Sequence, residues 1–403
     1  MTETDVAQNW NGSRLSAFRR RLLRWYDEHA RDLPWRRSRD PYRVWISEIM
    51  LQQTTVAAVV PYFERFLERF PTVAELAAAD ERDVLRHWEG LGYYSRARNI
   101  HKAARVLVAE YGGRFPESVD ELQRLPGIGR YTAGAIASFA FDQPASIVEA
   151  NTLRLYCRLL GYDGDPRSSR GQKLLWEFAG RLVQIGVRSD RLQPVAGVGS
   201  RCSFDRLKPV TTNHAGRLNH ALMDLGATVC RVTEPDCPSC PVQQHCAAFR
   251  DGTVAGIPAP AKKPEITELT EAAVVVRKNG RILLRQCRPG ERWAGLWDFP
   301  RFGIAANRDA QVEAEVLAQL RERVGIAVVL QSQLDDIRHS VTRYRIRLLC
   351  FTAKFASGRI AAKSGARWVP SSTLDGYPLS VTGRKIADTV SRQNSTANQR
   401  ECT

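Results

Sequence analysis

The sequence predicts a mainly α-helical first part, over residues 14–250, and a smaller α+β domain over residues 269–390. Three observations predict this division. The chain has 403 residues, which is enough for two to three domains. Apolar residues recur at three- and four-residue spacing through the first part, as they do in helices with one buried face. β-rich runs replace this pattern after residues 251–268, a stretch with three prolines, two lysines and two glycines that is typical of a linker.

Composition and charge narrow the class of protein. Hydrophobic residues make up 43% and charged residues 25% of the chain, which excludes wholesale disorder and a fibrous repeat. The sequence contains no long apolar run and no apolar segment near its start, so we expect no membrane span, no secretory signal and a cytoplasmic location. Lysine and arginine number 59 against 43 acidic residues, a formal net charge of +16, which favours nucleic acid as the partner over a merely soluble basic protein.

Prolines punctuate the helical part. Four segments carry the helical repeat of apolar residues: 22–26, 56–70, 73–79 and 100–111. Helix starts and stops are expected at Pro34, Pro61, Pro71, Pro116 and Pro126. Residues 184–213 interrupt the pattern with small residues between basic flanks, so we expect an inserted surface loop without a role in function.

The α+β domain is predicted to begin with a hairpin. β-rich runs at residues 272–276 and 281–287 flank Asn279-Gly280, a dipeptide typical of the tight turn between antiparallel strands. A further β-rich run lies at residues 345–353, and one helix is predicted at residues 309–323. Strands interrupted by a single helix predict an α+β fold.

Four of the nine cysteines form a cluster that predicts a metal site. Cys230, Cys237, Cys240 and Cys246 fall within 17 residues, with the spacing C-x6-C-x2-C-x5-C. With no secretory signal, a metal site in a reducing compartment is favoured over disulfides. Three unequal short gaps favour an iron–sulfur cluster over zinc, which remains the alternative. Nothing around the cysteines indicates redox work, so we expect a structural role.

Residues 125–130 (LPGIGR) predict a hairpin between two helices, followed by a helix of small residues at 131–140. Gly127 and Gly129 would let backbone N–H groups face outward at a helix N-terminus, where an anion is stabilised. In a basic chain the expected anion is a nucleic-acid phosphate, contacted without reading the base. A plain turn between helices is the alternative.

Two acidic residues are candidates for acid–base chemistry. Glu48 lies on a predicted helix at residues 43–55, on the face opposite its apolar residues. Its apolar neighbours could raise its pKa and make it a general acid, although a solvated surface glutamate is the alternative. Glu149 follows an apolar run and precedes a predicted helix at residues 152–160, where it could simply compensate the helix dipole. Spacing alone does not pair the two.

Taken together, these motifs resemble a known family. The chain resembles the adenine-specific DNA glycosylases of A/G-mismatch repair, in the helix-hairpin-helix, endonuclease III-like superfamily. The resemblance covers residues 14–250 apart from the insertion, and extends more weakly through the C-terminal domain. Besides the four cysteines it rests on four motifs in order: EIMLQQT (48–54), GLGYY (90–94), LPGIGR (125–130) and NHALMDLG (219–226).

The resemblance implies a fold, a cofactor and a substrate. The fold is two helical lobes with the active site in the cleft between them, and the cysteines hold a [4Fe–4S] cluster. The substrate is double-stranded DNA with adenine opposite 8-oxoguanine or guanine, and the adenine is flipped out before cleavage. We expect a monomer.

The resemblance also assigns roles to residues. Glu48 matches the acid that protonates adenine at N7, and Glu149 stands where the family carries the aspartate that stabilises the sugar cation. Glutamate keeps the charge with one more methylene, so we expect activity with altered geometry. The other matched residues line the pocket (Tyr131, Asn151), lie near the flipped adenine (Arg36, Asp224) or wedge into the base stack (Gln53, Tyr93). Tyr131 stands where bifunctional relatives carry a Schiff-base lysine, so a monofunctional glycosylase is expected.

The C-terminal domain resembles the Nudix-like domain that recognises 8-oxoguanine in the same family. WAGLWDFP (293–300) is the best match, and QLRERVG (319–325) keeps only part of the metal-binding pattern of Nudix hydrolases. The lesion-reading loop aligns with HSVTRY (339–344), where Thr342 or Arg343 could donate a hydrogen bond to the lesion. Two other functions are considered: a catalytically weak DNA-lesion binder and a Nudix-type nucleotide hydrolase.

Overall fold

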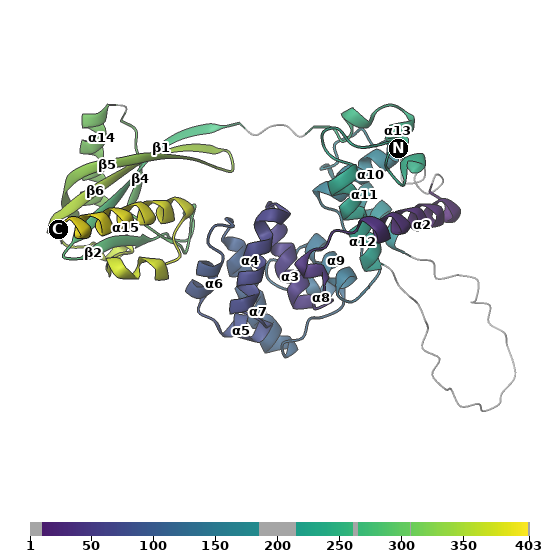
Figure 1. Cartoon of the computed structure of the whole chain (residues 1–403), viewed down its shortest axis with the longest axis horizontal. Helices are drawn as coiled ribbons and strands as arrows, with labels where there is room; N and C mark the ends of the chain where they lie inside the picture. The colour runs from purple at the N-terminus through teal and green to yellow at the C-terminus, as the bar shows by residue number, and fades with distance from the viewer. Residues whose placement is uncertain (1–9, 185–214, 261–264, 307, 402–403) are drawn as a thin grey trace. The chain divides into compact units, whose positions relative to one another are not determined.

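The structure is a computed structural model that describes residues 10–184, 215–260, 265–306 and 308–401 (Figure 1). The chain divides into two compact units. The first unit is Met1–Ala74 with Lys102–Ala261, and the second is Glu75–His101 with Lys262–Thr403. The predicted insertion at residues 184–213 lies almost wholly outside the described residues. Within the described part of the chain, no helix is long and apolar enough to cross a membrane.

The first unit is helical, as predicted. Two helices, α5 (Val73–Ala78) and α7 (Ser95–Tyr111), cross the boundary between the two units. Helix α6 (Glu81–His87) belongs to the second unit. The α-helices that lie wholly in the first unit are α2 (Gly12–His29), α3 (Pro41–Leu51), α4 (Val56–Arg69), α8 (Val119–Leu122), α9 (Arg130–Phe139), α10 (Ala150–Leu160), α11 (Ser169–Val183), α12 (Ala215–Asp224) and α13 (Ala247–Arg250).

One apolar core joins α2, α10, α11 and α12. Trp10, Phe18, Tyr156 and Phe178 are fully or almost fully buried there and meet edge to face, which aromatic rings prefer. Burying each large apolar side chain contributes roughly 1.5–3 kcal/mol. This core fixes the start of α10, the helix that carries Glu149 at its N-terminus.

Helix boundaries differ from two sequence predictions. The helix predicted at residues 43–55 is α3, which begins at Pro41 after the N-cap Asp40 and ends at Leu51. It stops early because Gln52 leaves the helical conformation, with ψ of 113°, and Gln53 has a left-handed backbone, with φ of 59°. Pro61 lies inside α4, so its assignment as a helix boundary was wrong.

The second unit contains a seven-stranded sheet of order β3-β2-β1-β6-β5, with β4 paired to β1 and β7 paired to β2. β1 runs parallel to β6, and the other pairs are antiparallel. The strands are β1 (Thr267–Lys278), β2 (Arg281–Gln286), β3 (Trp297–Asp298), β4 (Arg301–Gly303), β5 (Ile326–Val341), β6 (Tyr344–Gly358) and β7 (Ala366–Pro370).

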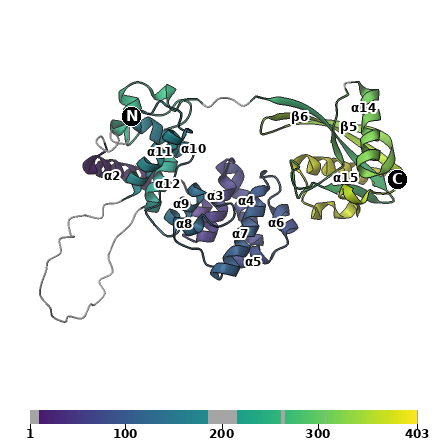
Figure 2. The ribbon, with the colours of Figure 1, turned by 180° about the vertical axis from the view of Figure 1, so that it is seen from behind.

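A helix covers each face of this sheet (Figure 1 and Figure 2). Helix α14 (Asp309–Gln319) buries Val312 and Val316 in one apolar cluster, and α15 (Val381–Glu401) buries Ile386 and Val390 in the other. Residues of β1 alternate between the two clusters, because successive side chains of a strand point to opposite faces. The predicted α+β fold is therefore confirmed, and so is the Asn279-Gly280 turn between β1 and β2.

Candidate functional site

A cavity of about 680 Å³ in the first unit collects most of the site residues that the sequence predicted there. It lies at the meeting of the C-terminal end of α3, the start of α9, the start of α10 and the end of α12. Residues with polar side chains on its wall are Arg31, Arg36, Glu48, Gln52, Gln53, Thr54, Thr55, Tyr131, Glu149, Asn151 and His220. Two acids that are about 100 residues apart in the sequence thus share one cavity.

Glu48 is buried, so the alternative of a solvated surface glutamate was wrong. Its side chain lies on α3 at 4% exposure, and the Tyr131 hydroxyl donates a 2.6 Å hydrogen bond to its Oε2 atom. Burial raises the pKa of Glu48 to about 7, although the Tyr131 hydrogen bond and the charge of Arg36 oppose the rise. The carboxylate of Glu149 adds to it. Glu48 can therefore hold a proton near neutral pH.

Glu149 is the N-cap of α10. Its Oε2 accepts from the Asn151 backbone N–H at 2.9 Å, and its Oε1 accepts from the Thr152 N–H at 2.8 Å. Burial raises the pKa of Glu149, whereas the backbone hydrogen bonds from Asn151 and Thr152 and the charge of Arg154 oppose the rise. The helix-start role and the cavity role thus coexist in one side chain.

Asn151 connects this acid to the cysteine segment. Its amide donates to Glu149 Oε2 at 3.3 Å, and its Oδ1 accepts from Arg154 at 3.0 Å. Arg154 also donates to the backbone carbonyls of Gly226 and Cys230, at 2.7 Å and 2.8 Å. A side chain at Gly226 would collide with Asn151, since a Cβ there would come within 3.0 Å of its atoms. Asn151 is therefore held in place by its hydrogen bonds with Glu149 and Arg154 and by the close approach of Gly226.

Arg36 is fixed by a buried aspartate. Two guanidinium nitrogens of Arg36 donate to the two carboxylate oxygens of Asp224, at 2.7 Å and 2.9 Å, and Arg31 also donates to Asp224. Asp224 is fully buried, and although burial opposes it, the hydrogen bonds and charges of Arg36 and Arg31 hold its pKa below the ordinary value. This two-pronged pairing presents Arg36 to the cavity in a single orientation.

Arg31 and His220 are among the residues of the cavity wall to which sequence reasoning gave no role. Arg31 shares Asp224 with Arg36, but no spacing pattern indicates this pairing. His220 stacks on Phe139 with ring centroids 3.9 Å apart, and burial lowers its pKa to about 3. His220 therefore stays neutral at physiological pH, as a flat, uncharged surface beside the acids. Its place in the NHALMDLG motif was the one available signal.

The hairpin of residues 125–130 precedes α9 as predicted. Gly127 has φ of 77°, a left-handed conformation that costs glycine little, and Gly129 is the N-cap of α9. No side chain caps this helix end, and a Cβ on Gly129 would meet nothing within 4 Å. Arg130 stacks over Trp176 at 3.9 Å. The start of α9 is thus open to an approaching anion.

Three of the predicted DNA contacts share an unusual backbone. Gln53, Tyr93 and Thr342 have φ of 59°, 48° and 52°, a left-handed conformation that is rare for residues other than glycine. Each such position costs of order 1–3 kcal/mol and persists where the surrounding structure enforces it, often at functional sites. Gln53 lies in the turn after α3 in the first unit, whereas Tyr93 and Thr342 belong to the second.

A second cavity, of about 500 Å³, lies in the second unit. Its wall includes Tyr93, which is 46% exposed, and Trp293, which stacks with His339 at 6.2 Å. Thr342 and Arg343 form the two-residue turn between β5 and β6, because Val341 pairs with Tyr344 across the hairpin. The predicted lesion-reading loop is therefore a tight β-turn, and Thr342 lies on the cavity wall.

The four cysteines of the C-x6-C-x2-C-x5-C motif line one small cavity, formed with residues of α10. Arg158 donates to Cys230 Sγ at 3.3 Å, and Cys246 Sγ donates to the Arg158 carbonyl at 3.3 Å. Across the described residues, no group of three or more His, Cys, Asp or Glu side chains is arranged to hold a single metal ion. The motif thus brings its sulfur atoms to one place without forming a mononuclear site.

Comparison with known proteins defines the class first. The HhH-GPD superfamily of base excision DNA repair proteins matches residues 46–181, and the NUDIX domain matches residues 271–389. The structure of a thermostable thymine-DNA glycosylase aligns with a TM-score of 0.49 and 27% identity, over 60% of this chain and 99% of that one. The chain is a helix-hairpin-helix base-excision protein followed by a Nudix-like domain.

Two curated relatives identify the family. The adenine DNA glycosylase of Rattus norvegicus is 39% identical over 299 residues, which cover 71% of this chain and 51% of the rat protein. The adenine DNA glycosylase of Homo sapiens is 31% identical over 429 residues, which cover 92% of this chain and 73% of the human protein. The chain belongs to the adenine DNA glycosylase family, and it spans about half the length of the rat relative.

Proposed function

We propose that this protein is a monofunctional DNA glycosylase that removes adenine opposite 8-oxoguanine or guanine in double-stranded DNA. The observation that carries the proposal is the shared cavity of Glu48 and Glu149, in which burial raises the pKa of Glu48 to about 7 and the carboxylate of Glu149 accepts two backbone hydrogen bonds at the start of α10. Membership of the adenine DNA glycosylase family supports the choice of base. The same relatives do not favour a DNA-lesion binder without activity.

The reaction follows from the chemistry that two carboxyl groups can perform in one cavity. Cleavage of an N-glycosidic bond leaves an electron-poor sugar cation and an electron-rich base. The departing base therefore needs a proton, and the sugar needs a nearby negative charge. Protonated Glu48 would donate to N7 of the flipped adenine, so that the base leaves neutral. Ionised Glu149, held by the start of α10, would face the sugar cation. Water then completes the hydrolysis.

Other residues of the cavity support these steps. Tyr131 would keep the Glu48 carboxyl group in one orientation through its 2.6 Å hydrogen bond, and Asn151 would do the same for Glu149. Arg36, fixed by Asp224, would contact the extruded adenine nucleotide. Gly127 and Gly129 would bind a backbone phosphate, and Gln53 and Tyr93 would fill the space that the base leaves. The turn Thr342-Arg343 would contact the opposite base.

The decisive test is base release without strand cleavage. We expect the purified protein to free adenine from a duplex with adenine opposite 8-oxoguanine, and to nick that strand only after alkali treatment. A tyrosine hydroxyl at position 131 cannot form a Schiff base, so borohydride should trap little covalent complex. A duplex with an adenine–thymine pair at the same position is the control. Failure to release adenine, or efficient trapping, would contradict the proposal.

We also propose that Cys230, Cys237, Cys240 and Cys246 hold a [4Fe–4S] cluster. The donor set fits, because four thiols line one cavity and an arginine reaches the sulfur of Cys230, as outer-sphere donors do around metal–thiolate centres. When bound, the cluster would cross-link the segment after α12 to the start of α13, where Cys246 is the N-cap.

Metal analysis tests the cluster directly. We expect about four iron atoms and about four inorganic sulfides per chain, the composition of the cluster that four thiolates hold. Replacing Cys237 by serine should remove most of this iron and lower the melting temperature. Cys350→Ala, which changes a buried cysteine of the second unit, should leave the iron content unchanged. Stoichiometric zinc in place of iron would contradict the assignment.

A further inference from the structure

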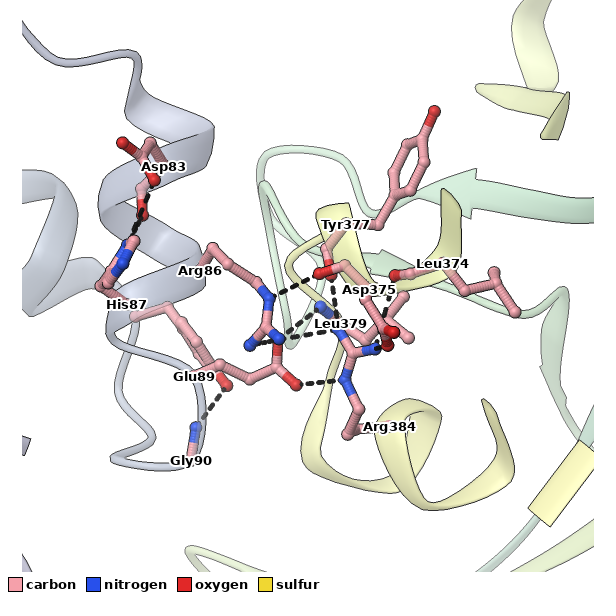
Figure 3. A network of polar contacts seen from close by, with 11 residues as sticks. Asp83, Arg86, His87, Glu89, Gly90, Leu374, Asp375, Tyr377, Leu379 and Arg384 are labelled. Atoms are coloured by element: carbon pink, nitrogen blue, oxygen red, sulfur yellow. Dashed lines mark hydrogen bonds and ion pairs between the residues drawn. The ribbon is translucent and has the colours of Figure 1, made fainter. Parts of the chain in front are cut away.

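A partly buried ionic network in the second unit joins the end of α6 and Glu89, which follows it, to the C-terminal domain (Figure 3). Arg384 donates to both carboxylate oxygens of Glu89, at 2.7 Å from Nε and 3.2 Å from Nη2. The Leu379 backbone N–H and Arg86 also donate to Glu89, each at 3.3 Å. Arg86 in turn donates to the Asp375 carbonyl at 2.7 Å. Two segments nearly 300 residues apart are thus tied by several charge-assisted hydrogen bonds.

The network is more than an exposed surface pair. The side chains of Glu89 and Arg384 are 7% and 17% exposed, so solvent screens their attraction only weakly. Arg384 also donates to Tyr377 O at 2.8 Å and to Asp375 Oδ1 at 3.0 Å, so its whole guanidinium group is bound. Removing one partner would leave the other charge buried and incompletely paired.

The position of Arg384 does not stabilise its own helix, α15. It is the fourth residue of α15, in the first turn, where the helix dipole disfavours a cation. Glu89 supplies the missing negative charge from another segment and also accepts from Leu379, just before the helix. The pairing is therefore explained by attachment of residues 86–89 to the start of α15, not by local helix stability.

A second tie lies on the other side of Tyr93. Arg98, in the first turn of α7, donates to the Ala294 carbonyl in the WAGLWDFP motif. The next residue, Gly295, has φ of 87°, and a Cβ there would come within 3.1 Å of the Arg98 guanidinium. Residues 90–97 are thus anchored to the C-terminal domain at both ends. Between the anchors, Tyr93 shares the 500 Å³ cavity with Thr342.

We infer that Glu89 and Arg384 are positioning residues that set Tyr93 against the Thr342-Arg343 turn, and so determine how strongly the protein distinguishes 8-oxoguanine from guanine opposite the adenine. Neither residue needs to touch DNA. If the tie loosens, Tyr93 and the turn no longer face the opposite base as one rigid pair, and the contacts that depend on both are weakened. This inference rests on the proposed function.

The test measures the preference for 8-oxoguanine over guanine opposite the adenine, first as a ratio of reaction rates and then as a ratio of binding affinities. We expect Glu89→Gln and Arg384→Met to reduce the preference for 8-oxoguanine over guanine by about tenfold, equivalent to roughly 1.4 kcal/mol of lost coupling. The single-turnover rate on saturating adenine–guanine duplex should stay within about twofold of wild type, because the cavity of Glu48 lies in the first unit. The double variant Glu89→Gln/Arg384→Met should be no worse than either single change.

Controls separate this role from general stability and from the proposed chemistry. Arg347→Met removes an ion pair with Asp336 between β5 and β6 and should keep the selectivity of wild type. Affinities for duplexes with an uncleavable adenine analogue opposite 8-oxoguanine or guanine give the same ratio without catalysis. An unchanged ratio in the Glu89 and Arg384 variants, or equal losses on both duplexes, would overturn the inference. Absence of adenine release by wild type would instead refute the proposed function.

Discussion

Replacing Glu48 by glutamine should lower the rate of adenine release by roughly 10²–10⁴-fold, the usual contribution of a general acid. Glutamine has nearly the same shape and still accepts a hydrogen bond from the Tyr131 hydroxyl, but it carries no transferable proton. The measurement is single-turnover base release from a duplex with adenine opposite 8-oxoguanine. Glu64→Gln, the same chemical change at an exposed site on α4, should leave the rate unchanged.

The pH profile gives an independent check on Glu48. Burial raises its pKa from the ordinary 4.5 to about 7, and the general acid must hold its proton. The single-turnover rate of wild type should therefore be high below pH 7 and fall as the pH rises through about 7. Because the pKa of Glu48 is higher in the folded protein than its ordinary 4.5, this contribution to stability is present below pH 4.5 and is lost as the pH rises to about 7, and Glu48→Gln should not lose it. A Glu48→Gln variant with wild-type rate would rule out this acid.

Replacing Glu149 by alanine should reduce the single-turnover rate by about 10²–10³-fold, the typical cost of losing one preorganised electrostatic group. The change also removes the N-cap of α10, and the free energy of unfolding should fall by about 1 kcal/mol. Glu149→Gln separates the two effects, because it removes the charge and retains an oxygen for the helix N–H groups. We expect it to lose rate with little loss of stability.

The aspartate variant is the matched test of side-chain length. Aspartate is a favoured N-cap residue and keeps the negative charge, so Glu149→Asp should retain activity and the cap of α10. Its rate reports how the additional methylene of Glu149 affects the geometry of the cavity. A normal rate in both Glu149→Ala and Glu149→Gln would exclude a role for this carboxylate in the reaction.

The sequence predicted elements well where the signal was local. Gly127 and Asn279-Gly280 lie in turns with left-handed backbones, and the apolar alternation of β1 matches the two faces of the sheet. The end of α3 was misplaced because the break at Gln52 and Gln53 involves neither glycine nor proline. Pro61 was misassigned because proline is usually found at helix ends, whereas α4 continues through this exposed proline.

The candidate site could not be assembled from the spacing of residues along the sequence alone. Helical face counting placed Glu48 away from apolar residues, and only the fold reveals that α9 and α10 cover that face. The pairing of Arg31 with Asp224 and that of Glu89 with Arg384 join residues far apart in the sequence, so no local pattern predicts them. Residues 75–101 looked like part of the helical domain, yet their contacts group them with the C-terminal domain.

The hydrogen bonds of Arg154 couple the evolution of two parts of the molecule, the cavity of Glu149 and the cysteine segment. One guanidinium group supports Asn151 beside Glu149 and also binds the carbonyls of Gly226 and Cys230. A change that moves the backbone at Gly226 or Cys230 would therefore also disturb Asn151 beside Glu149. Natural selection on the cavity of Glu149 would then act on the backbone of the cysteine segment as well.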